Sequence, residues 1–292
     1  MDAVDKSPLL KGQKSPSKRP LPTITTPTAF DKPEFKRHKG KDDTYKVAVV
    51  GQIGSYAHVA AQKFWDGNTN AYVHCRNFRG VFKAVSESRV DVGVVPIENT
   101  TMGYIHQIYD LLLQHSNLYI IGETTQHESH DLCAAADVPL NTIKRIISHP
   151  VALQQCSTFL MKHDEKVGEQ VQQVEAGDTA SACAELAKSG RKDTGVIANS
   201  EVAKMHSLQV LQQGISDDVN NTTRFIIIAS HPIKVDVQPH LSKTTIAFAL
   251  QDEPGSLYKA LSVFALRNIN IRKVFACAYV CTYKDVCRVG LT

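Results

Sequence analysis

Residues 220–225 read Asn-Asn-Thr-Thr-Arg-Phe and lead directly into the apolar segment Ile-Ile-Ile-Ala. A flexible linker is usually richer in glycine and serine. A core strand does not usually begin with two threonines and an arginine. The pattern therefore indicates a strand end that presents a hydroxyl group and a guanidinium group to a pocket.

Four further stretches combine hydroxyl groups, side-chain amides and backbone N–H groups at the point where a predicted helix begins. They are GQIGSY (51–56), PIENTTMG (96–103), SHPVALQQC (148–156) and GDTASA (177–182). Helix N-termini favour anions, although Ser, Thr, Asp and Asn are also ordinary N-cap residues. Each stretch alone is best explained as a cap. Together with residues 220–225 they predict a pocket for a polar, carboxylate-bearing small molecule.

Several motifs for other chemistries are absent from the sequence. There is no GxGxxG, GxxxxGK[ST], GxSxG or HExxH pattern, and none of the seven cysteines forms a CxxC pair. Phosphate-loop cofactors, a serine nucleophile on a sharp turn and a zinc site therefore lack support. We expect a reaction without a cofactor or metal, and reduced cysteines that pack as small apolar groups.

The basic charge of the chain lies in its first 44 residues. This segment holds ten of the 33 Lys/Arg, six of the 29 Asp/Glu and six of the 12 prolines, so the remaining chain is neutral. We expect a disordered tail and no nucleic-acid partner.

No apolar run approaches the roughly 18 residues of a membrane span. We expect no membrane association. We expect a cytoplasmic location, because no convincing transit peptide is present, and a plastid stays open as an alternative.

The segments that position these stretches alternate between strand and helix from Tyr45 to about residue 230. Strands are predicted near 45–51, 90–99, 118–136, 143–150, 194–199, 208–215 and 223–230, and helices near 55–65, 78–89, 103–114, 151–163 and 179–190. This alternation predicts an α/β fold with a largely parallel sheet. After a connector at 231–242, residues 243–292 open a second unit with a strand–helix–strand pattern.

The chain resembles the prephenate dehydratase family, including its arogenate dehydratase relatives. The resemblance rests on GQIGSYAHVAA, VGVVPIENTTMGYIHQIYDLL, ISHPVALQQC, DTASACAELA and NNTTRF, which occur in the family's order and spacing. It implies a catalytic region at 45–230 with two α/β lobes, 45–122 plus 217–230 and 123–216, resembling periplasmic binding proteins. It also implies a phenylalanine-sensing ACT domain of ferredoxin-like βαββαβ order and a homodimer or larger assembly.

The family's reaction suits the predicted pocket. Prephenate loses CO2 and its ring hydroxyl to give phenylpyruvate, and arogenate likewise gives phenylalanine. Aromatisation drives both reactions, so orientation and a hydrogen-bond donor at the leaving oxygen suffice in principle. We expect prephenate dehydratase activity, with arogenate dehydratase as the first alternative and a non-catalytic small-molecule binding module as the second.

The resemblance assigns site residues motif by motif. Thr223 matches the catalytic threonine and is expected to donate a hydrogen bond or relay a proton, and Arg224 is expected to bind a substrate carboxylate. The remaining substrate-binding candidates are Glu98, Asn99, Thr100, Ser148, Gln155 and Thr179. Asp178 is expected to cap a helix, Phe225 to lie in the core and His149 to be structural.

The C-terminal unit is predicted to be an incomplete ACT domain, because a complete one needs roughly 70 residues. The glycine-led loop Pro254, Gly255, Ser256 and Leu257 keeps one half of an effector site. The family's effector motif should fall at 275–278, which read Phe-Ala-Cys-Ala and carry no charge. We therefore expect weak or absent inhibition by phenylalanine.

Overall fold

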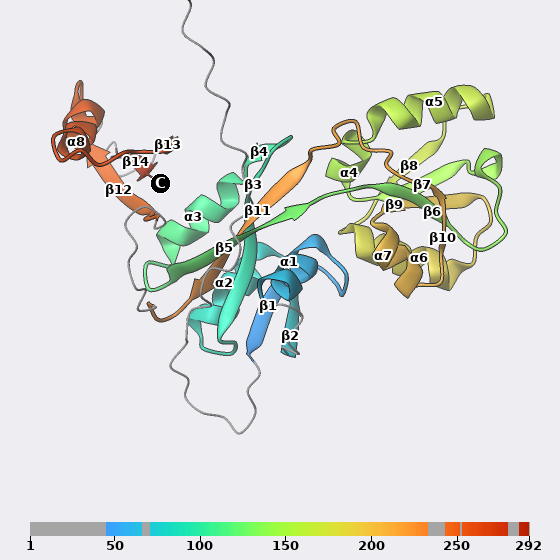
Figure 1. Ribbon diagram of the computed structural model, residues 1–292, viewed down its shortest axis with the longest axis horizontal. Coiled ribbons are helices and arrows are strands. Elements are labelled where there is room, and N and C mark those ends of the chain that lie inside the picture. Colours follow the sequence, from blue (N-terminus) through green and yellow to red (C-terminus); the bar gives the residue numbers. More distant parts are fainter. Residues whose placement is uncertain (1–44, 66–70, 233–242, 252, 280–285, 292) are drawn as a thin grey trace, which may run out of the picture. The chain divides into compact units, whose positions relative to one another are not determined.

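The computed structural model describes residues 45–65, 71–232, 243–251, 253–279 and 286–291, with only the backbone described for residues 247, 249, 275–279 and 286–291 (Figure 1). The predicted tail at 1–44 and most of the predicted connector lie outside the described residues. The described chain is a mixed α/β protein with three sheets.

The first sheet has the strand order β2-β1-β3-β11-β5, with the short β4 paired to β3. Its strands are β1 (Lys46–Val50), β2 (Ala71–Cys75), β3 (Val92–Asn99), β4 (Gly103–Tyr104), β5 (Tyr119–His127) and β11 (Thr222–Ala229). Strand β1 is parallel to β2 and β3, whereas β11 is antiparallel to both β3 and β5. The prediction of a largely parallel sheet is therefore wrong for this half, because β11 returns from a distant part of the chain and inserts between β3 and β5.

Helices cover both faces of the first sheet. On one face, α2 (Phe78–Ser86) and α3 (His106–Gln114) pack against Ile226 and Ile228 of β11. On the other face, α1 (Tyr56–Phe64) packs with Phe225 and Ile227. Alternate residues of β11 thus enter opposite cores, as the two-residue period of a strand requires. Phe225 is 2% exposed, which confirms its predicted place in the core.

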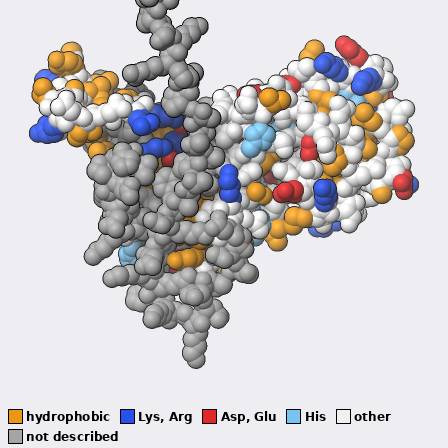
Figure 2. All heavy atoms as spheres, viewed as in Figure 1, with side chains coloured by type: hydrophobic (Ala, Val, Ile, Leu, Met, Phe, Trp, Pro, Cys, Tyr) orange, Lys and Arg blue, Asp and Glu red, His pale blue; other side chains and the backbone are white. Residues whose placement is uncertain are grey.

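The second sheet has the order β10-β6-β9-β7-β8, antiparallel from β10 to β9 and parallel from β9 to β8. Its strands are β6 (Asp131–Ala134), β7 (Arg145–Ser148), β8 (Gln172–Glu175), β9 (Thr194–Ala198) and β10 (Gln209–Gln212). Its helices are α4 (Pro150–Gln154), α5 (Ser157–Val167), α6 (Thr179–Ser189) and α7 (Ser200–Met205), with a single 3-10 turn at Leu140–Thr142. Figure 2 shows acidic and basic side chains interspersed over this part of the surface.

The helix predicted at 151–163 is two helices that break at Gln155 and Cys156. The backbone N–H of Asp217 donates to the carbonyl of Gln155 at 2.8 Å. The Asp217 carboxylate accepts hydrogen bonds from Ser157 Oγ at 2.8 Å and Thr158 N at 3.1 Å. A residue about sixty positions away therefore caps α5, and the break turns Gln155 out of the helix it was expected to occupy.

The polypeptide passes from the first sheet to the second directly after β5 and returns directly before β11. Strand β5 remains paired with β11 as far as His127, so the first sheet extends beyond residue 122, where we expected the first lobe to end. No helix in the described ranges is long and apolar enough to cross a membrane.

The C-terminal unit contains β12 (Ile246–Gln251), α8 (Ser256–Ala265), β13 (Val274–Tyr279) and β14 (Val286–Leu291). Strand β14 lies between β12 and β13 and is antiparallel to both. This arrangement is the split β-α-β unit of ferredoxin-like folds, as the resemblance implied. Gly255 begins α8 with φ of 85°, a conformation that suits glycine.

Candidate active site

Thr223 and Asn99 are opposite each other where β11 and β3 pair, and both are buried, with 3% and 6% of their surface exposed. Asn99 Nδ2 donates to Thr223 Oγ1 and to Asn221 Oδ1, both at 2.7 Å. Asn99 Oδ1 accepts from the backbone N–H groups of Thr101 at 2.9 Å and Met102 at 2.8 Å. These two backbone donors fix which end of the amide faces Thr223. Since Thr223 accepts from Asn99, its own proton can be donated elsewhere.

Glu128 lies directly after β5, the strand next to β11. Its backbone N–H donates to the carbonyl of Asn221 at 2.9 Å, which extends the pairing of β5 with β11 by one step. Burial raises the pKa of the Glu128 carboxyl, and a side-chain hydrogen bond with Thr223 partly opposes this rise. The site thus contains a hydroxyl group beside a carboxyl group whose pKa lies above its ordinary value.

Tyr56 connects this pair to the second sheet. Its hydroxyl donates to the carbonyl of Ser129 at 2.7 Å and lies 3.2 Å from His130 Nδ1. His130 Nε2 lies 2.8 Å from Gln155 Oε1, and in the tautomer that forms a hydrogen bond to this oxygen the Nε2 atom carries the proton. Burial lowers the pKa of His130 and, with help from nearby acidic groups, raises that of Tyr56. Both side chains are therefore neutral near pH 7.

Two amide nitrogens in this cluster are buried without a hydrogen-bond partner among the described residues. They are Gln155 Nε2 and Asn221 Nδ2, on side chains that are 6% and 1% exposed. A buried amide donor without a partner costs about 1–3 kcal/mol. Such donors suit a ligand that brings acceptor oxygens, and carboxylates are the strongest acceptors of this kind.

Arg224 points to the opposite face of β11 from Thr223, because adjacent residues of a strand alternate. Its guanidinium lies 3.0 Å from the Glu98 carboxylate and 2.9 Å from that of Glu123. Lys273 also contacts Glu98. Burial acts to raise the pKa of the Glu98 carboxyl, but the contacts with Lys273 and Arg224 lower it overall. The role of Arg224 in binding a substrate carboxylate stays a prediction, and these contacts argue against it. Glu98 faces the same ion-pair network instead of Thr223.

The other predicted residues take structural contacts. Thr100 Oγ1 accepts from Thr222 N at 2.9 Å and so ties the loop after β3 to β11. Ser148 is fully buried and donates to the carbonyl of Ile197 at 2.6 Å. Thr179, 8% exposed, is the first residue of α6. Their roles in substrate binding stay predictions.

Two capping predictions can be compared directly with the hydrogen bonds. The Asp178 carboxylate accepts from Ser181 N at 2.8 Å and begins α6 in a capping box, as expected. His149 Nδ1 accepts from Val151 N at 3.3 Å at the start of α4. Both side chains are thus occupied by helix N-termini.

The GQIGSY loop contacts elements of the second sheet. Gly54 has φ of 87°, and a Cβ atom there would lie 2.7 Å from Val202 Cγ2 of α7. Ser55 caps α1 by accepting from His58 N and donates to the carbonyl of Val50 at 3.0 Å. Glycine at position 54 therefore lets the loop approach α7 and fixes the start of α1, which carries Tyr56.

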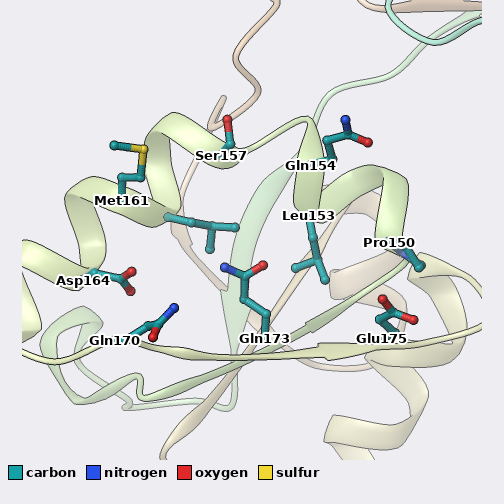
Figure 3. A pocket seen from close by; sticks show the side chains of 10 residues that line it. Pro150, Leu153, Gln154, Ser157, Met161, Asp164, Gln170, Gln173 and Glu175 are labelled. Atoms are coloured by element: carbon teal, nitrogen blue, oxygen red, sulfur yellow. The ribbon is translucent and has the colours of Figure 1, made fainter.

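A hollow of about 420 Å³ lies elsewhere, between α4, α5 and β8 (Figure 3). Leu153, Met161 and Gln173 are among its lining residues, and none of the buried cluster around Thr223 belongs to it. We therefore place the candidate site at Thr223 and not in this hollow. Within the described ranges, no three His, Cys, Asp or Glu side chains are grouped so as to hold a metal ion.

Comparison with known proteins agrees with the sequence motifs. The family model described as prephenate dehydratase matches residues 47–233. A curated relative, arogenate dehydratase/prephenate dehydratase 1, chloroplastic, from Arabidopsis thaliana, is 40% identical over 237 residues. That match covers 80% of this chain and 57% of the relative, so the chain spans little more than half of the relative's length.

Solved structures share the fold. A prephenate dehydratase from Arthrobacter aurescens, described in complex with L-Phe, gives a TM-score of 0.70 at 23% identity and covers 84% of this chain and 80% of that chain. A protein described as a quorum-quenching acylase gives a TM-score of 0.69 at 26% identity, over 84% of this chain and 86% of that chain. The family model matches more than half of the chain, and the ordered motifs lie within the matched range. The chain belongs to the prephenate dehydratase family.

Proposed function

We propose that this chain catalyses the decarboxylating dehydration of prephenate to phenylpyruvate, a lyase reaction in phenylalanine biosynthesis. The observation that carries the proposal is the Thr223 hydroxyl, which is buried and accepts a hydrogen bond from Asn99 at 2.7 Å, so that its own proton remains available for donation. Family membership supports the same reaction.

The bond changes define what the site must supply. The bond between the ring and its carboxylate breaks, and its electron pair enters the ring. The bond between the ring and its hydroxyl breaks, and that pair leaves with oxygen. Thr223 supplies a hydrogen bond to this oxygen as its negative charge develops, where a preorganised donor is most effective. The chemistry requires no electron sink, because aromatisation drives it.

The partnerless amides of Gln155 and Asn221 are placed to bind substrate oxygens. In this proposal they hold the substrate carboxylates. Binding thus fixes the substrate in the reactive orientation, so that less entropy is lost on the way to the transition state. The side chains of Thr100, Ser148 and Thr179 act in support, at the loop after β3, the end of β7 and the start of α6. Glu98 and Arg224 act on the opposite face by holding β3 and β11 together.

Arogenate is the second candidate substrate, because the Arabidopsis relative carries both dehydratase names. The two substrates differ only in a keto or an amino group on the side chain. No contact among the described residues is assigned to that group, so the choice of prephenate as the first candidate rests on the family model that matches the chain.

The test incubates the purified chain with prephenate and with arogenate separately and quantifies phenylpyruvate and phenylalanine. Prephenate is expected to give the higher kcat/KM. A higher kcat/KM with arogenate would reverse the substrate assignment, and turnover of neither would contradict the proposed function.

Partners and regulation are part of the same proposal. We propose a homodimer or larger assembly and assign the loop Pro254–Leu257 as a weak effector contact for phenylalanine. Analytical ultracentrifugation tests the assembly. Titration with phenylalanine tests the effector, and strong saturable inhibition at micromolar concentration would contradict the expectation of weak inhibition.

A further inference from the structure

Glu128 is a carboxyl group that the reaction described above does not use. It lies on the chain directly after β5, and its side chain shares a hydrogen bond with Thr223. The register places Thr223 opposite Gln126, and the backbone bond from Glu128 N to Asn221 O continues that ladder. Gln126 and Glu128 are two residues apart, so both face the side of the sheet that holds Thr223.

We propose that Glu128 is the proton source for the reaction and acts through Thr223. This inference rests on the proposed function. In it, Glu128 is a positioning residue, because it contacts Thr223 and not the substrate.

The hydrogen-bonding capacity of Thr223 leads to this assignment. A threonine hydroxyl has one proton and two lone pairs. One lone pair accepts from Asn99 Nδ2 at 2.7 Å. When Glu128 is protonated, it donates to the second lone pair, and the Thr223 proton is directed to the leaving oxygen. When Glu128 is ionised, it accepts the Thr223 proton itself, and no donor faces the substrate.

The surroundings favour the protonated form. Burial raises the pKa of Glu128. The titratable groups near it are Tyr56 on α1, His127 on β5 and, around Tyr56, His130, Asp131 and Cys156. Of these, His127 acts to lower the pKa of Glu128 without cancelling the effect of burial. Tyr56 and His130 are neutral, so neither supplies a charge that would hold Glu128 ionised.

The proton count closes in one turnover. The departing hydroxide takes the Thr223 proton and becomes water. Thr223 takes the proton of Glu128, which becomes a carboxylate. CO2 leaves with neither proton, and solvent returns a proton to Glu128 before the next turnover. A proton donor positioned in this way contributes about 10²–10⁴-fold to a rate.

The first test compares Glu128→Gln with the wild type across pH. Glutamine keeps the shape and can donate to Thr223 but cannot transfer a proton. We expect kcat to fall about 100-fold, with substrate affinity within about threefold of the wild type. The wild-type kcat should fall as pH rises through the raised pKa of Glu128, and this decline should be absent in Glu128→Gln.

The conservative and double variants sharpen this test. Glu128→Asp keeps a carboxyl group and should recover to within about tenfold of the wild type. Adding Glu128→Gln to Thr223→Val should cost no further rate, because both act on one proton path. The matched control is Glu165→Gln, an exposed position on α5, which should leave kcat unchanged. A Glu128→Gln variant with kcat within threefold of the wild type, or a pH decline that persists in it, would overturn the proposal.

A second readout needs no turnover. Carboxyl NMR of ¹³C-labelled glutamate measures the pKa of Glu128 directly, with Glu128→Gln identifying the signal. Thr223→Val should raise this pKa further, because it removes the hydrogen bond that favours the ionised form. An unchanged pKa would refute the contact between the two side chains. If the wild type turned over neither substrate, the proposed function would fail, whereas this titration would still decide the contact.

Discussion

Asn99→Asp changes one NH2 group into an oxygen at the centre of the site. Asn99 donates to Thr223 and Asn221 and accepts from two backbone N–H groups. An aspartate keeps the two accepted bonds but loses both donated ones. Asn221 can turn its partnerless amide nitrogen to the new carboxylate. Thr223 can turn its proton to it, and then no longer offers that proton to the leaving oxygen.

The magnitudes separate folding from catalysis. The number of hydrogen bonds is nearly conserved, so the free energy of unfolding should fall by only about 1–3 kcal/mol, the cost of a buried polar group with altered partners. Loss of one preorganised donor at a developing oxyanion costs about 10²–10³ in kcat. Substrate affinity should fall by no more than about tenfold, because only the Asn221 amide proposed to bind a carboxylate is drawn away, whereas the Thr223 hydroxyl acts in the transition state.

The assay measures kcat, KM and thermal unfolding of Asn99→Asp beside the wild type. The matched control is Asn117→Asp, an exposed asparagine of the same sheet region whose amide makes one 3.3 Å bond to Ser86. The control should match the wild type. A kcat for Asn99→Asp within about threefold of the wild type would refute the reasoning about the Thr223 proton.

Three further predictions follow from neighbouring contacts. Gln155→Met should raise KM about tenfold with a smaller change in kcat, because it removes a buried donor proposed to bind a carboxylate; an unchanged KM in steady-state assays would contradict this. Arg224→Lys should lower the free energy of unfolding by about 1–2 kcal/mol, because a lysine cannot bridge two partly buried carboxylates, and should leave KM within twofold. Urea unfolding and steady-state kinetics test these two expectations. A large increase in KM would restore the predicted carboxylate-binding role. Gly54→Ala should lower the melting temperature by several degrees, because φ is 87° and the new Cβ would lie 2.7 Å from Val202; an unchanged melting temperature would show that the loop can relax.

The sequence predicted those elements that carry a strong local pattern. Helices such as α2 and α6 have regular apolar spacing, and Gly190 ends α6 in the left-handed conformation expected of a C-terminal glycine. The edge strands β2 and β8 were not predicted, because their residues are partly exposed and mix polar with apolar side chains. The antiparallel half of the first sheet was also missed, since its strands pair across a hundred residues of chain.

The site shows the same division. Thr223 and Asn99 were both predicted, and strand pairing brings them together. The opposite orientation of Arg224 follows from strand alternation, which the sequence could have indicated once its strand was assigned. Glu128 gave no such signal, because its role depends on the non-local pairing of β5 with β11 and on the burial that this pairing creates.

Single-turnover kinetics of Thr223→Val with prephenate test the central claim most directly. Valine nearly preserves the shape of the side chain and removes only the hydroxyl that Asn99 holds. Substrate should bind with a Kd within about threefold of the wild type, and the rate of phenylpyruvate formation should fall about 10²–10³-fold. A rate of phenylpyruvate formation close to that of the wild type would contradict the account.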